Sequence, residues 1–138
     1  MLSSQTKDEI TAKAMESLRA KVNPLSVENV FSISEDEIGK LIYPVGFWKT
    51  KAKHIVKSTQ ILKENYDGDI PNTIEGLCKL SGVGPKMAYI AMSVAWKNTV
   101  GIGVDTHVHR ISNRLGWTRK QTKSPEATRK ELEDWLPR

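Results

Sequence analysis

LSGVGPKMAYIAM, residues 80–92, places a short glycine-rich turn at the start of an apolar run. Gly82 and Gly84 tolerate positive φ angles and let another molecule approach the backbone closely, because neither has a Cβ atom. Pro85 presets the first helical turn and has no amide that would be left unpaired there. The pattern therefore predicts two helices joined by a hairpin whose free backbone N–H groups suit a phosphate. For so short a motif, a plain tight turn between packed helices is the alternative.

Lys86 lies in the first turn of the second of these helices, where the helix dipole disfavours a cation. A helix N-terminus and partial burial both act against the charged ammonium form of lysine. A neutral amine is a nucleophile, so a position that is poor for a cation is good for amine chemistry. A lysine at the surface beside a turn is the alternative.

The composition is that of a folded globular protein. Of 138 residues, 38% are hydrophobic and 27% are charged. No apolar stretch reaches the roughly 18 residues of a membrane span, and the N-terminal segment lacks the pattern of a signal peptide. The formal charge of +5 fits a polyanionic partner such as nucleic acid, although many ordinary basic proteins have the same balance. One cysteine, Cys78, excludes an internal disulfide and a zinc or iron–sulfur centre built from cysteines of this chain alone.

Apolar residues recur three and four positions apart along nearly the whole chain, and the alternation typical of strands is absent. This periodicity predicts one all-α domain over residues 1–138 with about seven helices, and a helix-hairpin-helix at about 73–97. The segment from Pro85 to about Trp96 is apolar nearly all round, which predicts a buried helix. Helix N-caps are expected at Thr6, Ser34, Thr73, Asp105 and Ser124.

Four segments, in the same order along the chain, match one known pattern. LSGVGPKMA (80–88) fits L-P-G-V-G-x-K-T-A, and VDTHVHRISNR (104–114) fits V-D-T-H-x-x-R-x-x-N-R, with LSSQTKD (2–8) and YPVGFWKTKAKHI (43–55) before them. Together they resemble the endonuclease III branch of the helix-hairpin-helix DNA glycosylase superfamily. Ser81 and Met87 replace the usual proline and threonine, and neither is a reactive group. The resemblance implies the helix-hairpin-helix DNA glycosylase fold, with flanking N-terminal and iron–sulfur segments missing from a chain that looks like a fragment.

The same resemblance implies two catalytic residues. Lys86 corresponds to the nucleophile that attacks the anomeric carbon of a damaged nucleotide. Asp105 corresponds to the carboxylate that assists departure of the base, by stabilising positive charge on the sugar or by moving protons. Its position one residue before an expected helix also fits a simple N-cap, and the two roles are compatible.

Further residues are implied to contact DNA. Gln5 corresponds to the glutamine that fills the space left when a base is rotated out of the duplex, and Phe47 lies in the apolar wedge loop. For Gln5 the alternative is a polar residue near a helix start, and for Phe47 a core aromatic. The remaining expected contacts are the hairpin, Gly82, Val83 and Gly84, and His107 on the lesion or a phosphate.

Other basic residues carry weaker expectations. His107 also fits an ordinary helix residue. Lys49, Lys51 and Lys53 fit phosphate contacts or a solvated helix face, and His109, Arg110 and Arg114 fit a solvated or phosphate-facing stripe rather than catalytic groups.

The resemblance implies a bifunctional DNA glycosylase and abasic-site lyase of base excision repair that removes oxidised pyrimidines and cleaves the strand by β-elimination. The partner would be double-stranded DNA with such a lesion or an abasic site. The protein would act as a monomer and would not associate with a membrane. The family's 4Fe–4S cluster would be held by four cysteines absent from this chain, which itself would hold no metal. The location would be the nucleus and also the mitochondrion in a eukaryote, and otherwise the cytoplasm. A non-catalytic DNA-binding module and a monofunctional mismatch glycosylase are the alternatives.

Overall fold

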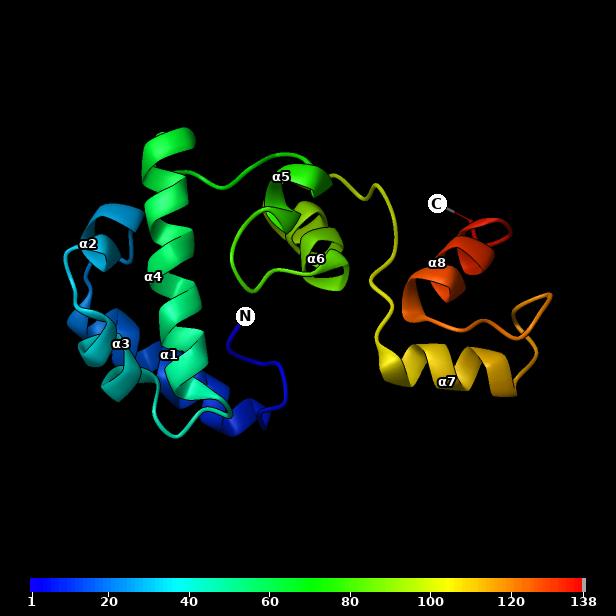
Figure 1. The fold of residues 1–138 in the computed structure, drawn as a ribbon, viewed down its shortest axis with the longest axis horizontal. Helices are drawn as coiled ribbons and strands as arrows, with labels where there is room; N and C mark the ends of the chain where they lie inside the picture. The colour runs from blue at the N-terminus through cyan, green and yellow to red at the C-terminus, as the bar shows by residue number, and fades with distance from the viewer. Residues whose placement is uncertain (138) are drawn as a thin grey trace. The chain divides into compact units, whose positions relative to one another are not determined.

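The computed structural model describes residues 1–137, which contain eight helices and no strand. The all-α class predicted from the sequence is therefore confirmed. In chain order the helices are α1 (Asp8–Lys21), α2 (Val27–Phe31), α3 (Glu35–Ile42), α4 (Trp48–Asn65), α5 (Ile74–Cys78), α6 (Pro85–Ala95), α7 (Thr106–Arg114) and α8 (Pro125–Glu133) (Figure 1).

Contacts along the chain divide it into two compact units. The first contains residues 1–71 together with 79–83, and the second contains residues 72–78 and the chain from 84 onward. The hairpin is divided between them, since Gly82 and Val83 belong to the first unit and Gly84 to the second. That the whole chain folds as a single domain stays a prediction.

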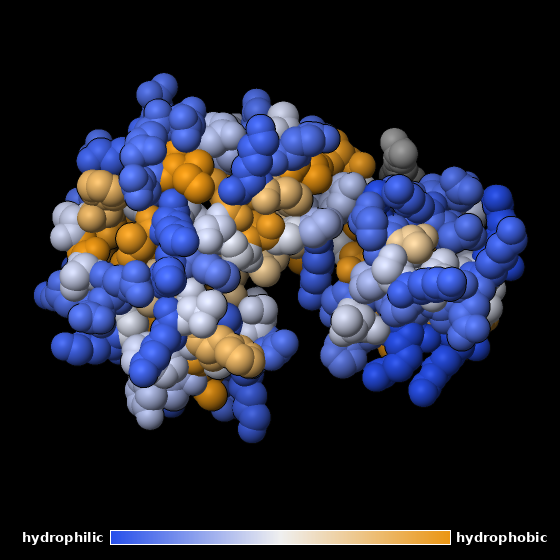
Figure 2. Space-filling model, viewed as in Figure 1, coloured by the Kyte–Doolittle hydropathy of each residue, from blue (hydrophilic) through white to orange (hydrophobic). Residues whose placement is uncertain are grey.

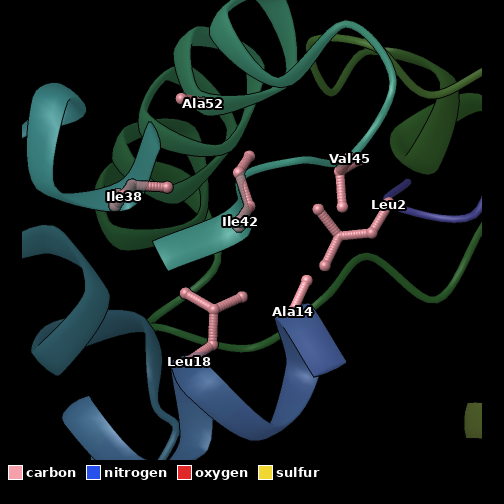
Figure 3. Packing of buried hydrophobic residues seen from close by; sticks show 7 residues of the cluster. All are labelled: Leu2, Ala14, Leu18, Ile38, Ile42, Val45 and Ala52. Carbon is pink, nitrogen blue, oxygen red and sulfur yellow. The ribbon is translucent and has the colours of Figure 1, made fainter. Parts of the chain in front are cut away.

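In the first unit, α2 and α3 pack against α4, and α1 packs against α3. Its core is aliphatic, and Figure 3 shows the side chains of Leu2, Ala14, Leu18, Ile38, Ile42, Val45 and Ala52. Burying each of the larger ones contributes about 1.5–3 kcal/mol. A Cβ atom on Gly39 would lie 2.9 Å from the ring of Trp48, so the glycine lets α3 approach α4 closely.

In the second unit, α5 packs against α6 and α7 against α8. Arg129 on α8 forms ion pairs with Glu126 and Glu133, and its guanidinium lies 4.8 Å from the ring centroid of Tyr89 on α6. Glu133 also accepts a hydrogen bond of 2.8 Å from the backbone N–H of Ile102. Through Arg129 and its two carboxylate partners, α8 is therefore connected both to α6 and to the segment that precedes α7.

Four of the five expected N-caps are confirmed. Ser34, Thr73 and Ser124 each accept a hydrogen bond from a backbone N–H three residues later, and Asp105 caps α7. Thr6 is not a cap, because α1 begins after Lys7 without a side-chain cap. The hydroxyl of Thr6 bonds elsewhere in the first unit, as described below.

The prediction that the helix after the hairpin is buried is wrong. Only Ala88 and Met92 of α6 are buried, whereas Ile90 and Val94 are 48% and 66% exposed. Apolar character all round the helix indicates burial only if neighbours cover every face, and within the described residues Ile90 and Val94 are left uncovered. Figure 2 shows hydrophobic residues reaching the surface among hydrophilic ones.

Candidate functional site

The structure brings Lys86 and Asp105 together. Lys86 is the second residue of α6 and Asp105 is the residue before α7, nineteen positions further on. Lys86 Nζ lies 3.2 Å from Asp105 Oδ2, and the two side chains are 47% and 29% exposed. The amine is therefore held beside a carboxylate and is open to a ligand.

Asp105 is held in place by the start of α7. Its Oδ1 accepts hydrogen bonds from the backbone N–H groups of His107 (3.0 Å) and Val108 (2.8 Å), which leaves Oδ2 for Lys86. The Val108 N–H, then Lys86 and the His107 N–H, hold the pKa of this carboxyl below its usual value, against the effect of burial. Asp105 is therefore ionised and oriented at neutral pH, and the cap explains its orientation.

The segment before α7 passes close to Lys86. A Cβ atom on Gly103 would lie 3.2 Å from the backbone oxygen of Lys86 and 3.3 Å from Ile90 Cγ1, so glycine permits this approach. On the same unit, a cavity of about 290 Å³ is lined by residues of α6, α8 and the connecting segments, among them Lys86, Tyr89, Val104, Ser124 and Arg129. The segment that leads to Asp105 thus runs directly beside the first turns of α6, and the cavity lies next to Lys86.

His107 lies one residue inside α7 and is exposed, with its Nδ1 3.4 Å from Arg110 Nη2. His109 differs from the predicted solvated stripe. Its Nδ1 lies 2.6 Å from Thr128 Oγ1 on α8, and its backbone oxygen accepts a hydrogen bond from Asn113. His109 is therefore part of the packing between α7 and α8.

The structure accounts for glycine at position 82 but not for glycine at position 84. Gly82 has φ +79°, and a Cβ atom there would lie 2.2 Å from His54 Nδ1 on α4. Gly84 has φ −102°, and a Cβ atom there would meet nothing within 4 Å. Glycine at 82 is thus required by the fold, whereas nothing within residues 1–137 requires it at 84. Because no contact within the described residues explains the missing side chain at Gly84, its exposed backbone suits close approach by another molecule.

The first unit exposes Gln5 and Phe47 and joins the loops that carry them. Phe47 is 67% exposed, so it is not a core aromatic. Both residues have positive φ, +52° and +57°. The backbone N–H of Gly46 donates to Thr6 Oγ1 at 3.0 Å, and a Cβ atom on Gly46 would lie 2.6 Å from the backbone oxygen of Gln5.

The expected site residues thus form two sets, each within one unit. Gln5, Phe47, Gly82 and Val83 belong to the first unit, and Gly84, Lys86, Asp105 and His107 to the second. Their roles in catalysis and DNA binding stay predictions.

Sequence reasoning missed the part played by α4 in holding these loops. Lys51 is 5% exposed and bonds to the N-terminal segment, and Ser58 Oγ donates to the backbone oxygen of Ser81 at 3.0 Å. The prediction that Lys51 contacts phosphate or solvent is therefore wrong. One signal was available, because position 51 falls among the inward-facing positions of α4, beside Ala52 and three residues after Trp48.

A model of the family described as HhH-GPD superfamily base excision DNA repair protein matches residues 1–138. The chain belongs to this superfamily. It is 59% identical over 138 residues to mouse "Endonuclease III-like protein 1", a match that covers all of this chain and 45% of that protein. The fission yeast "Endonuclease III homolog" is 49% identical over 139 residues, with 100% of this chain and 39% of that protein covered.

Solved structures of HhH-GPD relatives agree with the fold. A trapped endonuclease III–DNA covalent intermediate has a TM-score of 0.89 and 32% identity, covering 99% of this chain and 62% of that one. A non-covalent endonuclease III–DNA complex has a TM-score of 0.88 at the same identity and coverage. The resemblance seen in the sequence is confirmed. The chain spans about half the length of the curated relatives that it matches.

The residues of this chain do not fit an iron–sulfur cluster. Such a cluster needs several thiolate ligands, and the chain has one cysteine, Cys78. Burial, then Glu75 and Glu126, raises the pKa of its thiol and so disfavours the thiolate. Among residues 1–137, no group of three or more His, Cys, Asp or Glu side chains could hold a metal ion. In the same range, no helix is both long and apolar enough to cross a membrane.

Proposed function

We propose that this chain carries the catalytic core of a bifunctional DNA glycosylase and abasic-site lyase acting on oxidised pyrimidines. The observation that carries the proposal is the distance of 3.2 Å between Lys86 Nζ and Asp105 Oδ2. A non-catalytic DNA-binding module has no need of an exposed amine held against a carboxylate that is itself fixed as a helix cap. The trapped covalent intermediate of the similar endonuclease III supports chemistry that passes through a protein–DNA bond.

In the first step, Lys86 Nζ forms a bond to C1′ of the damaged nucleotide as the bond from C1′ to the base breaks. The base leaves with the electron pair and takes up a proton. The amine attacks only when neutral, and Asp105 Oδ2, which accepts a hydrogen bond from Nζ, lies where it relays the proton that the nitrogen gives up to solvent. While ionised, Asp105 also stabilises positive charge that develops on the sugar.

In the second step, the sugar ring opens as the nitrogen on C1′ becomes a Schiff base. The imine makes the C2′ proton acidic, and removal of that proton expels the 3′ phosphate by β-elimination. The strand is cut, and hydrolysis of the imine returns the free amine of Lys86. The sequence resemblance carries this order of events, and the pair of residues supplies its nucleophile and its carboxylate.

The basic charge of the chain and its bare backbone at Gly84 support duplex DNA as the partner. In this proposal Gln5 fills the space that the lesion leaves, and the exposed Phe47 enters the opposite strand. A monomeric state and a nuclear or mitochondrial location remain proposals that follow from the resemblance.

A single-turnover assay on a duplex with one thymine glycol tests the function. The wild-type protein is expected to release the base and to leave a strand ending in an unsaturated aldehyde, and Lys86→Gln is expected to do neither. Binding without base release by the wild type would favour the non-catalytic module. Base release without strand cleavage would favour the monofunctional glycosylase.

A further inference from the structure

Lys51 is a buried lysine in the first turn of α4. Its side chain is 5% exposed, whereas Lys49 and Lys53 on either side of it are exposed. Burial of the ammonium lowers the pKa of Lys51. Within residues 1–137 no carboxylate forms an ion pair with it. A buried charge without a counter-ion is costly, so its other partners have to compensate.

Those partners are three oxygens of the N-terminal segment. Lys51 Nζ donates to the backbone oxygen of Leu2 at 2.9 Å, to that of Ser4 at 2.5 Å and to Thr6 Oγ1 at 3.2 Å. An ammonium group has three N–H donors, so all of them are used on one short segment. Hydrogen bonds from a charged donor are stronger than those between neutral groups, so these three compensate part of the cost of burying the ammonium.

The three acceptors lie on both sides of Gln5. Ser4 precedes it, Thr6 follows it, and its own backbone has φ +52°, which a glutamine adopts only if its surroundings impose it. Thr6 Oγ1 also accepts from Gly46, the residue before Phe47. One ammonium group therefore fixes the loop of Gln5 and, through Thr6, the loop of Phe47.

We propose that Lys51 is a positioning residue that holds Gln5 in the geometry required to enter the duplex. The inference rests on the proposed function, in which Gln5 fills the space of the rotated base. Lys51 touches neither lesion nor sugar, and it acts through the backbone oxygen of Ser4 before Gln5 and the hydroxyl of Thr6 after it. A role limited to stabilising the fold is the alternative.

The experiment uses the intact protein in four forms, wild type, Lys51→Met, Gln5→Ala and the double variant, with Lys57→Met as control. Lys57 is an exposed lysine on the same helix, so its substitution removes the same charge without touching the N-terminal segment. The DNA is a duplex with a stable abasic-site analogue and 2-aminopurine opposite it, whose fluorescence rises when that base is unstacked. Single-turnover cleavage of a thymine-glycol duplex is measured alongside.

At saturating protein, the wild type and Lys57→Met are expected to raise 2-aminopurine fluorescence. Lys51→Met is expected to lose the rise, as Gln5→Ala does. Both single variants should slow thymine-glycol cleavage on the order of 10- to 100-fold, the size of effect that small misplacements produce. The double variant should be no slower than the slower single variant by more than about twofold, because both act through one contact.

Two results separate the possible failures. If Gln5→Ala loses the fluorescence and Lys51→Met, folded by its melting curve, retains it, the positioning role is wrong although the proposed function stands. If the wild type itself neither unstacks nor cleaves, the proposed function is wrong. Should Lys51→Met not fold, Thr6→Val replaces it, because it removes one acceptor and the link to Gly46 at nearly constant volume. Full fluorescence in a folded Thr6→Val would then contradict the proposal.

Discussion

Asp105 divides its two carboxylate oxygens between the backbone and Lys86. Oδ1 accepts from the backbone N–H groups of His107 and Val108 in the first turn of α7, and Oδ2 lies 3.2 Å from Lys86 Nζ. The residue that starts a helix is therefore also the residue that faces the candidate nucleophile. In one side-chain position, Asp105 both caps α7 and contacts Lys86.

Asp105→Asn separates the two roles. The amide oxygen of asparagine still caps a helix about as well as aspartate, so the melting temperature should change little. The negative charge beside Lys86 is lost, and single-turnover cleavage of thymine-glycol DNA should fall on the order of 100-fold or more. Asp105→Ala is the matched variant, since it should lose the same activity and about 1 kcal/mol of stability as well. Equal activity of wild type and Asp105→Asn would contradict the assignment.

The pH dependence of stability follows from the same carboxyl. Its pKa is lower in the folded protein than in the unfolded chain, where it is about 3.9. The stabilisation is therefore complete above about pH 5 and is lost as the pH falls through the folded value. Urea unfolding from pH 7 to pH 3 should show wild type losing stability faster than Asp105→Asn below about pH 4. Parallel curves would show that Asp105 is not held as described.

The two hairpin glycines should respond differently to substitution. At position 84 the φ angle is one that valine adopts readily, and the space around a new side chain is open. The Gly84→Val protein should therefore fold normally. Its affinity for damaged and undamaged duplexes should fall alike, because the branched side chain blocks approach of a phosphate. If only lesion-containing DNA bound more weakly, the hairpin would be reading the damage, and its assignment as a phosphate contact would be wrong.

Gly82→Val should instead damage the fold. A positive φ costs a residue with a Cβ atom roughly 1–2 kcal/mol, and the new atom would lie 2.2 Å from His54 Nδ1. Thermal unfolding compares this variant with Gly84→Val. A melting temperature unchanged from wild type in Gly82→Val would show that the contact with His54 is not close.

Phe47→Ala tests the apolar wedge. Because the ring is 67% exposed, stability should change by no more than about 0.5 kcal/mol. Cleavage of thymine-glycol DNA should slow on the order of 10-fold, while binding to undamaged duplex is retained. A large loss of stability with unchanged cleavage would make Phe47 a structural residue.

The elements that local sequence determines were predictable. Ser34, Asp105 and Ser124 act as caps because a short polar side chain just before a helix accepts hydrogen bonds from first-turn N–H groups that have no partner within the helix. This interaction needs only residues that are neighbours in the sequence. Lys86 and Asp105 were linked through the resemblance alone, and the structure brings them within 3.2 Å.

The features that depend on tertiary contacts were missed. Thr6 has the cap pattern, but its hydroxyl bonds to Gly46 and Lys51, more than forty positions away in the second case. Lys51 itself looked like one of several solvated lysines, because no local rule predicts that three oxygens of another segment will surround it. The exposed face of α6 was missed because apolar periodicity does not say which neighbours are present.

The most direct test of the central claim is reduction with borohydride in the presence of an abasic-site oligonucleotide. If Lys86 Nζ forms a Schiff base with the sugar, the wild-type protein should give a covalent adduct, and a digest should carry the modification on the peptide that contains Lys86. Lys86→Gln should give no adduct while still binding the same DNA through the hairpin backbone. An adduct of undiminished yield in Lys86→Gln would show that another amine reacts and would contradict the account.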